Sequence, residues 1–455
     1  MNAIVIIVGI VAIIWGMVYS VRGSLVYGCL ACLVVAFCFG HAFLRFEIGP
    51  LPMTFDRLML AGLILVYVIQ RRLGLADPKP MAWPDVAMLL LAVVLVFSTF
   101  SHNWRLDAPG KISPVWRLVA GFLSPMVLYW IARQSRIEEK TLQTVYGVLA
   151  GFGVYLAVTA LAEVTQQWWI VFPRYISDPT VGIHFGRARG AVLQSQSLGL
   201  HLDVCLLCLW MWRRDLGRVG LLVSTLLIPL FLAAIFFTYT RCVWIGAALC
   251  ALTVLGLPMS NRWRAAIFGP ALAAALLLAI FQWDNLVRME RPEGGGAAGE
   301  SVDTRSSFNY VSWKMFLDQP LLGVGYGQFQ EAARSYLSDR DTSLQLESIR
   351  GQPNHNMFLA LLTETGLIGG GLFVTILAGW TIGALRMWRD ATAPDWVRSQ
   401  GLLMLGMLGI YLGPALFFDL TFSPHDNCIT FFMAGLTASL WRRDWRHAEI
   451  TPAAL

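Results

Sequence analysis

The sequence predicts an all-α fold, a polytopic transmembrane helical bundle of about 12–13 spans with one large outer helical loop. The first observation behind this prediction is composition, because 57% of the 455 residues are hydrophobic and only 14% are charged. Soluble domains carry about 25% charged residues, which keep their surfaces hydrated. The second observation is that the apolar residues gather in runs of about twenty. A helix of that length crosses the bilayer with all its backbone hydrogen bonds satisfied internally.

Apolar runs mark the predicted spans in chain order. The first run has neither a basic n-region nor a small-residue cleavage site, so we expect a retained span and not a signal peptide. The predicted spans are 3–20, 24–44, 53–70, 84–101, 113–132, 141–163, 197–212, 219–239, 242–258, 264–281, 358–385, 399–418 and 427–441.

Lysine and arginine set the predicted orientation, because they accumulate in cytoplasmic loops. With the N-terminus outside, the short cytoplasmic loops and the C-terminal tail hold eighteen Lys and Arg, and the short outer loops hold seven. We therefore expect the N-terminus outside and the C-terminus in the cytoplasm. The predicted organisation is helices 1–10 in 1–281 with an outer segment at 164–196, an outer loop at 282–354, helices 11–13 in 355–445, and a cytoplasmic tail at 446–455.

The outer loop at 282–354 is the only large piece predicted outside the bilayer. Its glycine-rich stretch EGGGAAGES (293–301) predicts flexibility. Further on, Tyr310, Trp313, Met315 and Phe316 are grouped as on an amphipathic helix, and GQFQEAARSYLSD (327–339) indicates a second short helix. We expect a compact helical cap on the outer face. The segment 164–196 carries aromatic side chains that favour the headgroup layer.

The ionisable residues within or beside the predicted spans all lie in the outer half. Charges inside spans are costly, so each indicates a function or a close partner. A proton or ion pathway needs polar groups through the full membrane depth, whereas this pattern predicts a polar cup open to one side. For Asp56 and Arg57 a structural ion pair is favoured. The full set is Asp56, Arg57, Arg117, Glu163, His201, Asp203, Arg241, His355, Asp419, His425 and Asp426.

Several kinds of chemistry are disfavoured. The glycines of GVGYGQF (323–329) lack the Gly-Lys-Ser/Thr of a Walker A motif, so they predict a turn and not a phosphate loop. The CxxC pairs Cys29–Cys32 and Cys205–Cys208 lie inside apolar runs without further ligands nearby, so we expect no metal site and no disulfide framework. The net charge of +6 follows from the cytoplasmic loops and does not predict nucleic-acid binding.

An outward-facing site has no access to ATP or nucleotide sugars, so its substrate must arrive already activated. Sugars linked to a polyprenyl pyrophosphate meet this need, because the pyrophosphate is the leaving group. Arginine is well suited to bind this pyrophosphate, because its planar guanidinium group forms bidentate hydrogen bonds with phosphate oxygens. Any one arginine fits headgroup contact equally well, but several together would stabilise the developing diphosphate charge without a metal. The candidates are Arg187 and Arg189 in HFGRARGAV, Arg241 in FTYTRCVW, and Arg305 in DTRSSFNY.

His355, in GQPNHNMFLALLTETGLIGG (351–370), is the candidate base. Glycan transfer to a hydroxyl benefits from a base with a pKa near neutrality. The alternative is an ordinary interfacial histidine, but the flanking Asn354 and Asn356 make this helix start polar, with Asn354 a possible N-cap. Glu364 follows nine residues later on the opposite helix face, so it orients the imidazole only if the helix breaks between them. The glycines 366, 369, 370 and 371 predict close helix packing.

These motifs together resemble the O-antigen ligase/polymerase superfamily. The segments concerned are PLLGVGYGQF (320–329), NHNMFLALLTETGLIGG (354–370), TYTRCVWIGAAL (238–249) and HFGRARGAVLQSQSLG (184–199), in the family's order across roughly 164–440. The chain departs from the family in reading QSQS after Arg189, where many relatives carry Asn-Pro-Asn. It also has thirteen predicted spans where the family's ligases usually have twelve.

The resemblance implies a glycosyltransferase of the bacterial inner membrane with a periplasmic site, no metal and no cofactor. Its donor would be an undecaprenyl-pyrophosphate-linked glycan and its acceptor a lipid A–core sugar. The family's essential histidine maps to His355, its diphosphate-binding arginines map to Arg189 and Arg241, and Arg187 and Arg305 match less securely. Asn356 and Glu364 would support the site.

Other functions stay open at this stage. An O-antigen or exopolysaccharide polymerase or a protein O-oligosaccharyltransferase would use the same site with another acceptor. A lipid or polysaccharide flippase fits the outer-only charges poorly, and a non-catalytic scaffold of envelope assembly is a third possibility.

Overall fold

The computed structural model describes residues 23–39, 45–48, 51–104, 113–182, 185–264, 266, 269–270, 298–339 and 341–441. Some predictions fall outside these residues. They are the span at 3–20, nearly all of the span at 264–281, the glycine-rich residues 293–297 and the tail at 446–455.

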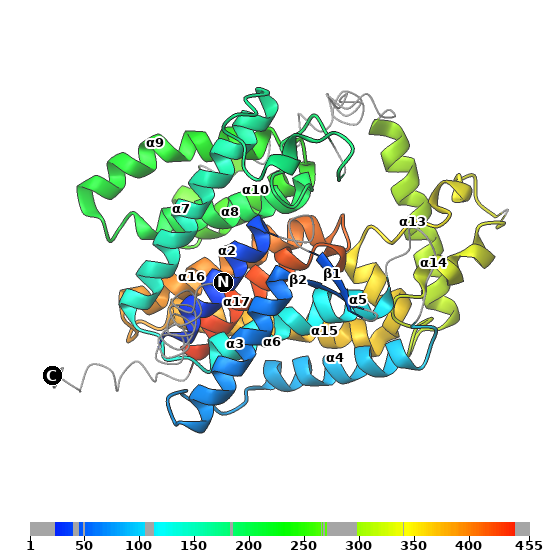
Figure 1. Ribbon diagram of the computed structural model, residues 1–455, viewed down its shortest axis with the longest axis horizontal. Coiled ribbons are helices and arrows are strands. Elements are labelled where there is room, and N and C mark those ends of the chain that lie inside the picture. Colours follow the sequence, from blue (N-terminus) through cyan, green and yellow to red (C-terminus); the bar gives the residue numbers. More distant parts are fainter. Residues whose placement is uncertain are drawn as a thin grey trace, which may run out of the picture.

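The described chain is a helical bundle with one short β-hairpin (Figure 1). Strands β1 (Arg45–Ile48) and β2 (Leu51–Thr54) pair antiparallel, a feature the sequence analysis did not predict. The first helices are α2 (Leu25–Cys38), α3 (Phe55–Arg72), α4 (Trp83–Phe100), α5 (Pro114–Leu118), the π-helical turn η1 (Val119–Leu123), α6 (Ser124–Arg133), α7 (Glu139–Val164) and the 3-10 turn η2 (Arg174–Ser177). There follow α8 (Ser195–Trp212), α9 (Gly217–Phe236), α10 (Arg241–Gly256), α13 (Ala298–Asp318), α14 (Phe329–Ala332), η3 (Ala333–Tyr336), η4 (Leu346–Ile349), α15 (Met357–Arg389), α16 (Asp395–Ala415), η5 (Leu420–Phe422) and α17 (Pro424–Ser439).

The predicted spans from 24 to 258 and from 358 to 441 each coincide with helical structure, 113–132 being the continuous α5–η1–α6. Within the described residues, five helical segments are long and apolar enough to cross a membrane: α4, Pro114–Arg133, α7, α9 and α15. Helices α2 and α10 are shorter and apolar. The predicted fold class is confirmed, and the chain is a multi-pass helical membrane protein.

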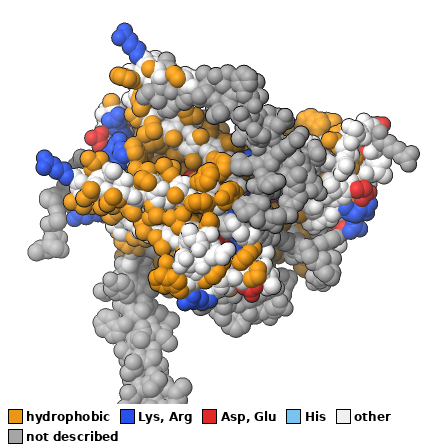
Figure 2. Space-filling view, turned by 90° about the horizontal axis from the view of Figure 1, so that it is seen from above, with side chains coloured by type: hydrophobic (Ala, Val, Ile, Leu, Met, Phe, Trp, Pro, Cys, Tyr) orange, Lys and Arg blue, Asp and Glu red, His pale blue; other side chains and the backbone are white. Residues whose placement is uncertain are grey.

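The surface of the bundle is apolar where a soluble protein would be charged. Large side chains such as Val93, Phe97 and Leu226 are each more than 60% exposed. Figure 2 shows hydrophobic side chains over the middle of one face, with Lys and Arg side chains toward its edges. An apolar area of this extent indicates contact with lipid.

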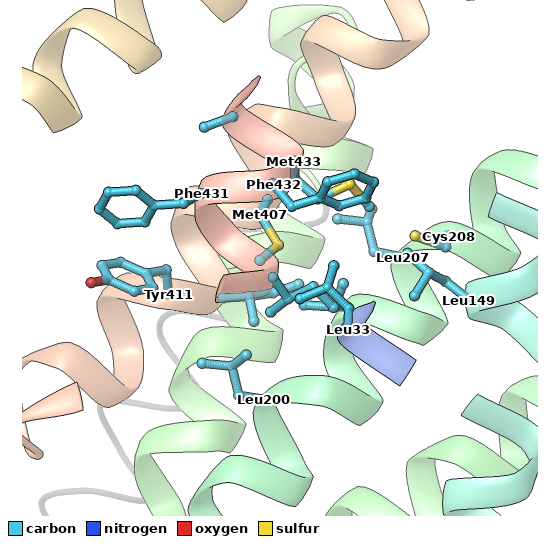
Figure 3. Packing of buried hydrophobic residues seen from close by; sticks show 14 of the residues in the cluster. Leu33, Leu149, Leu200, Leu207, Cys208, Met407, Tyr411, Phe431, Phe432 and Met433 are labelled. Atoms are coloured by element: carbon cyan, nitrogen blue, oxygen red, sulfur yellow. The ribbon is translucent and has the colours of Figure 1, made fainter. Parts of the chain in front are cut away.

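The core lies between α8, α16 and α17, which are buried along most of their length. Figure 3 shows Leu207 of α8 near Phe432 and Met433 of α17, with Met407 of α16 on the other side of these side chains and Leu200 farther along α8. Lipid is as apolar as these side chains, so tight packing stabilises such contacts more than the hydrophobic effect does. Helices α10 and α16 also pack closely: a Cβ on Gly413 would lie 2.5 Å from the carbonyl oxygen of Cys242. This contact fixes the start of α10, where Arg241 lies.

Residues 298–339 and 341–354, the described part of the predicted outer loop, form a compact helical cap with a small core of its own. Helix α13 packs on η3, η4 and α15, and GQFQEAARSYLSD contains α14 and η3. The predicted apolar face of α13 is partly wrong. Met315 is buried, as expected of that face, but Trp313 is about half exposed and lies outside the buried face. The buried side chains of this core are Phe308, Val311, Met315, Phe329, Ala333, Leu337, Leu346 and Ile349. Figure 1 places α13 and α14 together at one end of the bundle.

Candidate functional site

His355 lies in the short connection between the cap and α15, and asparagines hold it on both sides. The Asn354 side-chain nitrogen donates to Ser312 Oγ of α13 at 2.8 Å, and its Oδ1 accepts from the Asn356 backbone N–H at 2.9 Å. Asn356 Oδ1 accepts from the N–H groups of Phe358 and Leu359. The N-cap of α15 is therefore Asn356, and the interpretation of Asn354 as the cap is wrong. Asn354 instead ties the loop to α13.

The His355 imidazole lies among aromatic rings. Its centroid is 4.7 Å from that of Phe308 and 6.2 Å from that of Phe418, both in edge-on geometry. Burial, and then the positive charge of Arg305, lower the pKa of His355 to about 4. Among the residues that the structure describes, none forms a hydrogen bond with the ring nitrogens. At neutral pH the ring is therefore uncharged, with a nitrogen lone pair available to a ligand.

Arg305 of α13 is brought to the same place by the aromatic loop after α16. Its guanidinium carbon lies 5.6 Å from the ring centroid of Phe417 and 5.9 Å from that of Phe418. Phe418 thus contacts both Arg305 and His355.

Arg241 is the first residue of α10, directly before Cys242. Thr240 before it is extended, and its hydroxyl bonds the carbonyl of Thr238. Helix N-termini carry partial positive charge and free N–H groups, which favour bound anions. Of the predicted site residues, His355 and Arg305 lie together, His355 in the connection before α15 and Arg305 on α13, with Phe418 against both.

Arg187 and Arg189 occupy different environments although only one residue separates them. The Ala188 N–H between them donates to the carbonyl of Phe237 at 3.1 Å, which sets this segment against the turn before Arg241. Arg187 is buried there, at 4% exposure.

Arg189 is fully buried, and the protein itself takes up most of its donors. Its Nε lies 3.2 Å from Glu163, at the end of α7, and both terminal nitrogens donate to carbonyls of Ile176, Asp178 and Val181. Glu163 also accepts from the backbone N–H groups of Arg189 and Gly190. This geometry folds the outer segment 164–196 against α7 and leaves little of the guanidinium for a ligand.

A buried ionic network that the sequence analysis did not assemble lies close to His355. Both Glu364 oxygens accept from Arg117 Nη1, at 2.7 and 2.8 Å. Arg117 Nη2 donates to Asp419 at 2.6 Å, and its Nε donates to the Thr421 hydroxyl at 2.6 Å. The rings of Tyr326 and Phe422 each lie 4.7 Å from the Arg117 guanidinium carbon. The network joins α5, α15 and the connection that carries Phe418.

The glycine-rich turn 323–327 interrupts α15 at Gly366. The turn residues Gly323, Gly325 and Gly327 have positive φ angles, as does Gly366 (φ +65°, ψ −163°). The N–H groups of Val324 and Gly325 donate to the carbonyls of Thr363 and Glu364. A Cβ on Gly366 would lie 2.2 Å from the Leu321 carbonyl oxygen, so only glycine fits. The segment 323–329 is a turn, as predicted, but Gly366 breaks the helix where close packing was expected of it.

Because the break follows Glu364, the helix from Met357 to Glu364 stays continuous. The Glu364 carboxylate bonds Arg117, and within the described contacts it does not reach His355. The spacing of His355 and Glu364 predicts that they do not form a dyad, and the described contacts agree.

The QSQS stretch after Arg189 binds the start of α17. Asp426 accepts hydrogen bonds from Gln196 and Ser197, each at 2.6 Å, and Ser423 donates to Gln194 at 2.6 Å. His201 Nδ1 lies 3.5 Å from the same Asp426 carboxylate. The departure from the family pattern therefore has a local structural use.

Residues 226–374 match the family model described as O-antigen ligase. The predicted resemblance is confirmed over this part of the chain. The matched range contains Arg241, Arg305, His355, Asn356 and Glu364, whereas Arg187 and Arg189 precede it. A search of the curated proteins found no match to the chain.

Proposed function

We propose that the protein transfers a glycan from undecaprenyl pyrophosphate to a hydroxyl of lipid A–core at the periplasmic face of the inner membrane, without a metal. The observation that carries this proposal is the uncharged His355 imidazole beside Arg305, with the Phe418 ring against both. A neutral base next to fixed positive donors suits a hydroxyl that attacks a diphosphate-linked sugar.

In this proposal the arginines have different roles, some binding the donor and others holding the site in shape. Arg305, Arg241 and the N-terminus of α10 bind the donor diphosphate, and Arg187 approaches it from the 185–194 segment. Arg189 anchors that segment through Glu163 and does not bind the diphosphate itself. Arg117 and Glu364 hold the Phe417–Phe418 loop against His355.

The chemical step is a direct displacement. His355 accepts the proton of the acceptor hydroxyl, and the hydroxyl oxygen forms a bond to the anomeric carbon. The bond from that carbon to the diphosphate oxygen breaks, and undecaprenyl diphosphate leaves with the electron pair. Attack opposite the leaving group inverts the anomeric centre. The proton on His355 then passes to the diphosphate or to water.

Because the pKa of His355 is low, its strength as a base depends on whether the donor is bound. With the site empty, Arg305 helps to hold the pKa at about 4, where imidazole is a weak base. A bound diphosphate offsets the charge of Arg305 and raises the pKa of His355 toward its ordinary value. The base therefore strengthens only when the donor is in place.

The test is transfer by the purified protein in the presence of a chelator. Undecaprenyl-pyrophosphate glycan is supplied with and without lipid A–core, and products are resolved by size. We expect glycan on lipid A–core, a loss of about 10²–10⁴-fold in rate for His355→Gln, and normal transfer by the loop control Gln352→Ala.

The proposal fails if folded His355→Gln protein transfers at the normal rate or if the chelator abolishes transfer. A ladder of longer lipid-linked glycan in both tubes would identify a polymerase. Glycan on a peptide hydroxyl but not on lipid A–core would identify a protein O-oligosaccharyltransferase.

A further inference from the structure

A cavity of about 820 Å³ opens at the end of the bundle opposite His355. It lies between the start of α4, the second half of α15 and the residues that follow α17. Helix α15 runs on past its break at Gly366 to Arg389, and at about 1.5 Å per residue the part after the break is long enough to cross the hydrocarbon core between the His355 end and this cavity. The residues that matter here are Trp83, Gly379, Gly383, Arg386, Arg389 and Trp441, all of which line the cavity.

Two arginines give the cavity its charge. Arg386 and Arg389 are three residues apart in the last turn of α15, so they lie on one side of the helix, and both are exposed. Within the described part of the chain, neither makes an ion pair or a hydrogen bond. Asp390 also lines the cavity, with its Oδ1 bonded to Thr392, so the rim keeps a net positive charge.

A nearby arginine shows the contrast. Arg398 of α16 lies 3.3 Å from Asp395 and donates to the Trp388 carbonyl. It does not line the cavity. The same surface therefore contains one arginine with protein partners and two that face an open volume.

Indole rings form the walls. A Cβ on Gly379 would lie 2.4 Å from Pro84, and one on Gly383 would lie 2.4 Å from Trp441. These glycines let the start of α4 and the Trp441 ring lie directly on α15. The Trp441 Nε1–H is buried without a hydrogen-bond partner in the described structure. Tryptophan is typical of the membrane interface, where one part of the ring is apolar and its N–H is polar.

We propose that this cavity binds the head group of an anionic phospholipid in the adjacent leaflet. Arg386 and Arg389 pair with its phosphate, and the apolar lining contacts the glycerol and the first acyl carbons. Basic pockets between spans recognise anionic head groups in this way, and the guanidinium fork matches phosphate geometry. The site is at the opposite end of α15 from His355 and does not depend on the proposed function.

The test measures lipid retention by the full-length protein. Purified protein is exchanged into detergent with equal phosphatidylglycerol and phosphatidylcholine, and bound lipid is counted by native mass spectrometry. We expect retained phosphatidylglycerol, at least a tenfold loss in Arg386→Gln/Arg389→Gln, and unchanged retention in Arg398→Gln. Trp441→Phe, which keeps a ring but removes the N–H, should give a smaller loss. Unfolding temperatures without added lipid confirm that the variants are folded.

Three outcomes would overturn the proposal. One is equal retention by the double variant and the Arg398 control. Another is equal binding of phosphatidylcholine and phosphatidylglycerol. The last is complete displacement of the lipid by millimolar inorganic phosphate, which would make the cavity a phosphate site.

Discussion

Arginines at the two ends of the bundle differ in what they contact. At the end that carries the cap, Arg117 and Arg189 are 4% and 0% exposed and are bonded to carboxylates on other helices. At the opposite end, Arg386 and Arg389 are exposed toward a cavity, with no ion pair among the described residues. The difference indicates that Arg117 and Arg189 hold the site in shape, whereas Arg386 and Arg389 are placed to meet molecules outside the chain.

The strongest way to break this comparison is Arg117→Met. Removing Arg117 leaves Glu364 and Asp419 buried as carboxylates without their shared partner, and breaking a buried pair costs about 3–5 kcal/mol. We expect a large drop in the unfolding temperature of the purified protein and loss of transfer. The control is Arg350→Gln, which removes an exposed pair with Glu347 and should leave the unfolding temperature unchanged. Similar behaviour of the two variants would contradict a structural role for the network.

The next comparison separates Arg189 from Arg187. Arg189→Gln should lower the unfolding temperature and open the 164–196 segment to added protease, because Glu163 loses its partner. Arg187→Gln should leave the unfolding temperature nearly unchanged and raise the KM for the lipid-linked donor by about tenfold, the effect of one charged hydrogen bond. The assignment is reversed if Arg189→Gln raises the donor KM in a protein of normal stability.

The membrane class, the helices and their order could be predicted from the sequence, because hydropathy over twenty residues needs no knowledge of distant partners. The network around Arg117 could not be predicted. Its partners are 247 and 302 residues away along the chain. The sequence showed Arg117 and Asp419 at the same outer depth, which was the available signal, but depth alone does not pair charges.

Dependence on distant partners also explains why the different roles of Arg187 and Arg189 could not be predicted. Arg187 and Arg189 look equivalent in HFGRARGAV, and only the fold of 164–190 around Glu163 distinguishes them. The break at Gly366 was hidden because its cause, the backbone of the 320–325 turn, lies more than forty residues earlier. His355, by contrast, was identifiable from its polar neighbours at a helix start.

Arg305→Gln tests the electrostatic part of the site through pH. His355 must be neutral to accept a proton, so kcat/KM of the wild-type protein should fall only as pH drops toward about 4. Removing the positive charge raises the pKa of His355, so the fall in kcat/KM should begin at higher pH in the variant. In the wild type, kcat should also decline at higher pH than kcat/KM, because the bound diphosphate offsets Arg305. An unchanged pH profile in Arg305→Gln would show that Arg305 does not act on His355.

The smallest expected effect is at the N-cap of α15. Asn356→Ala removes the acceptor for the N–H groups of Phe358 and Leu359, which costs about 1 kcal/mol. The loop holding His355 should loosen, and kcat should fall a few-fold with little change in donor KM. Asn356→Asp keeps the acceptor and adds a negative charge beside His355, so it should retain stability and shift the acid limb of kcat/KM to higher pH. Equal losses of stability in both variants would mean that the cap does not set the position of the histidine.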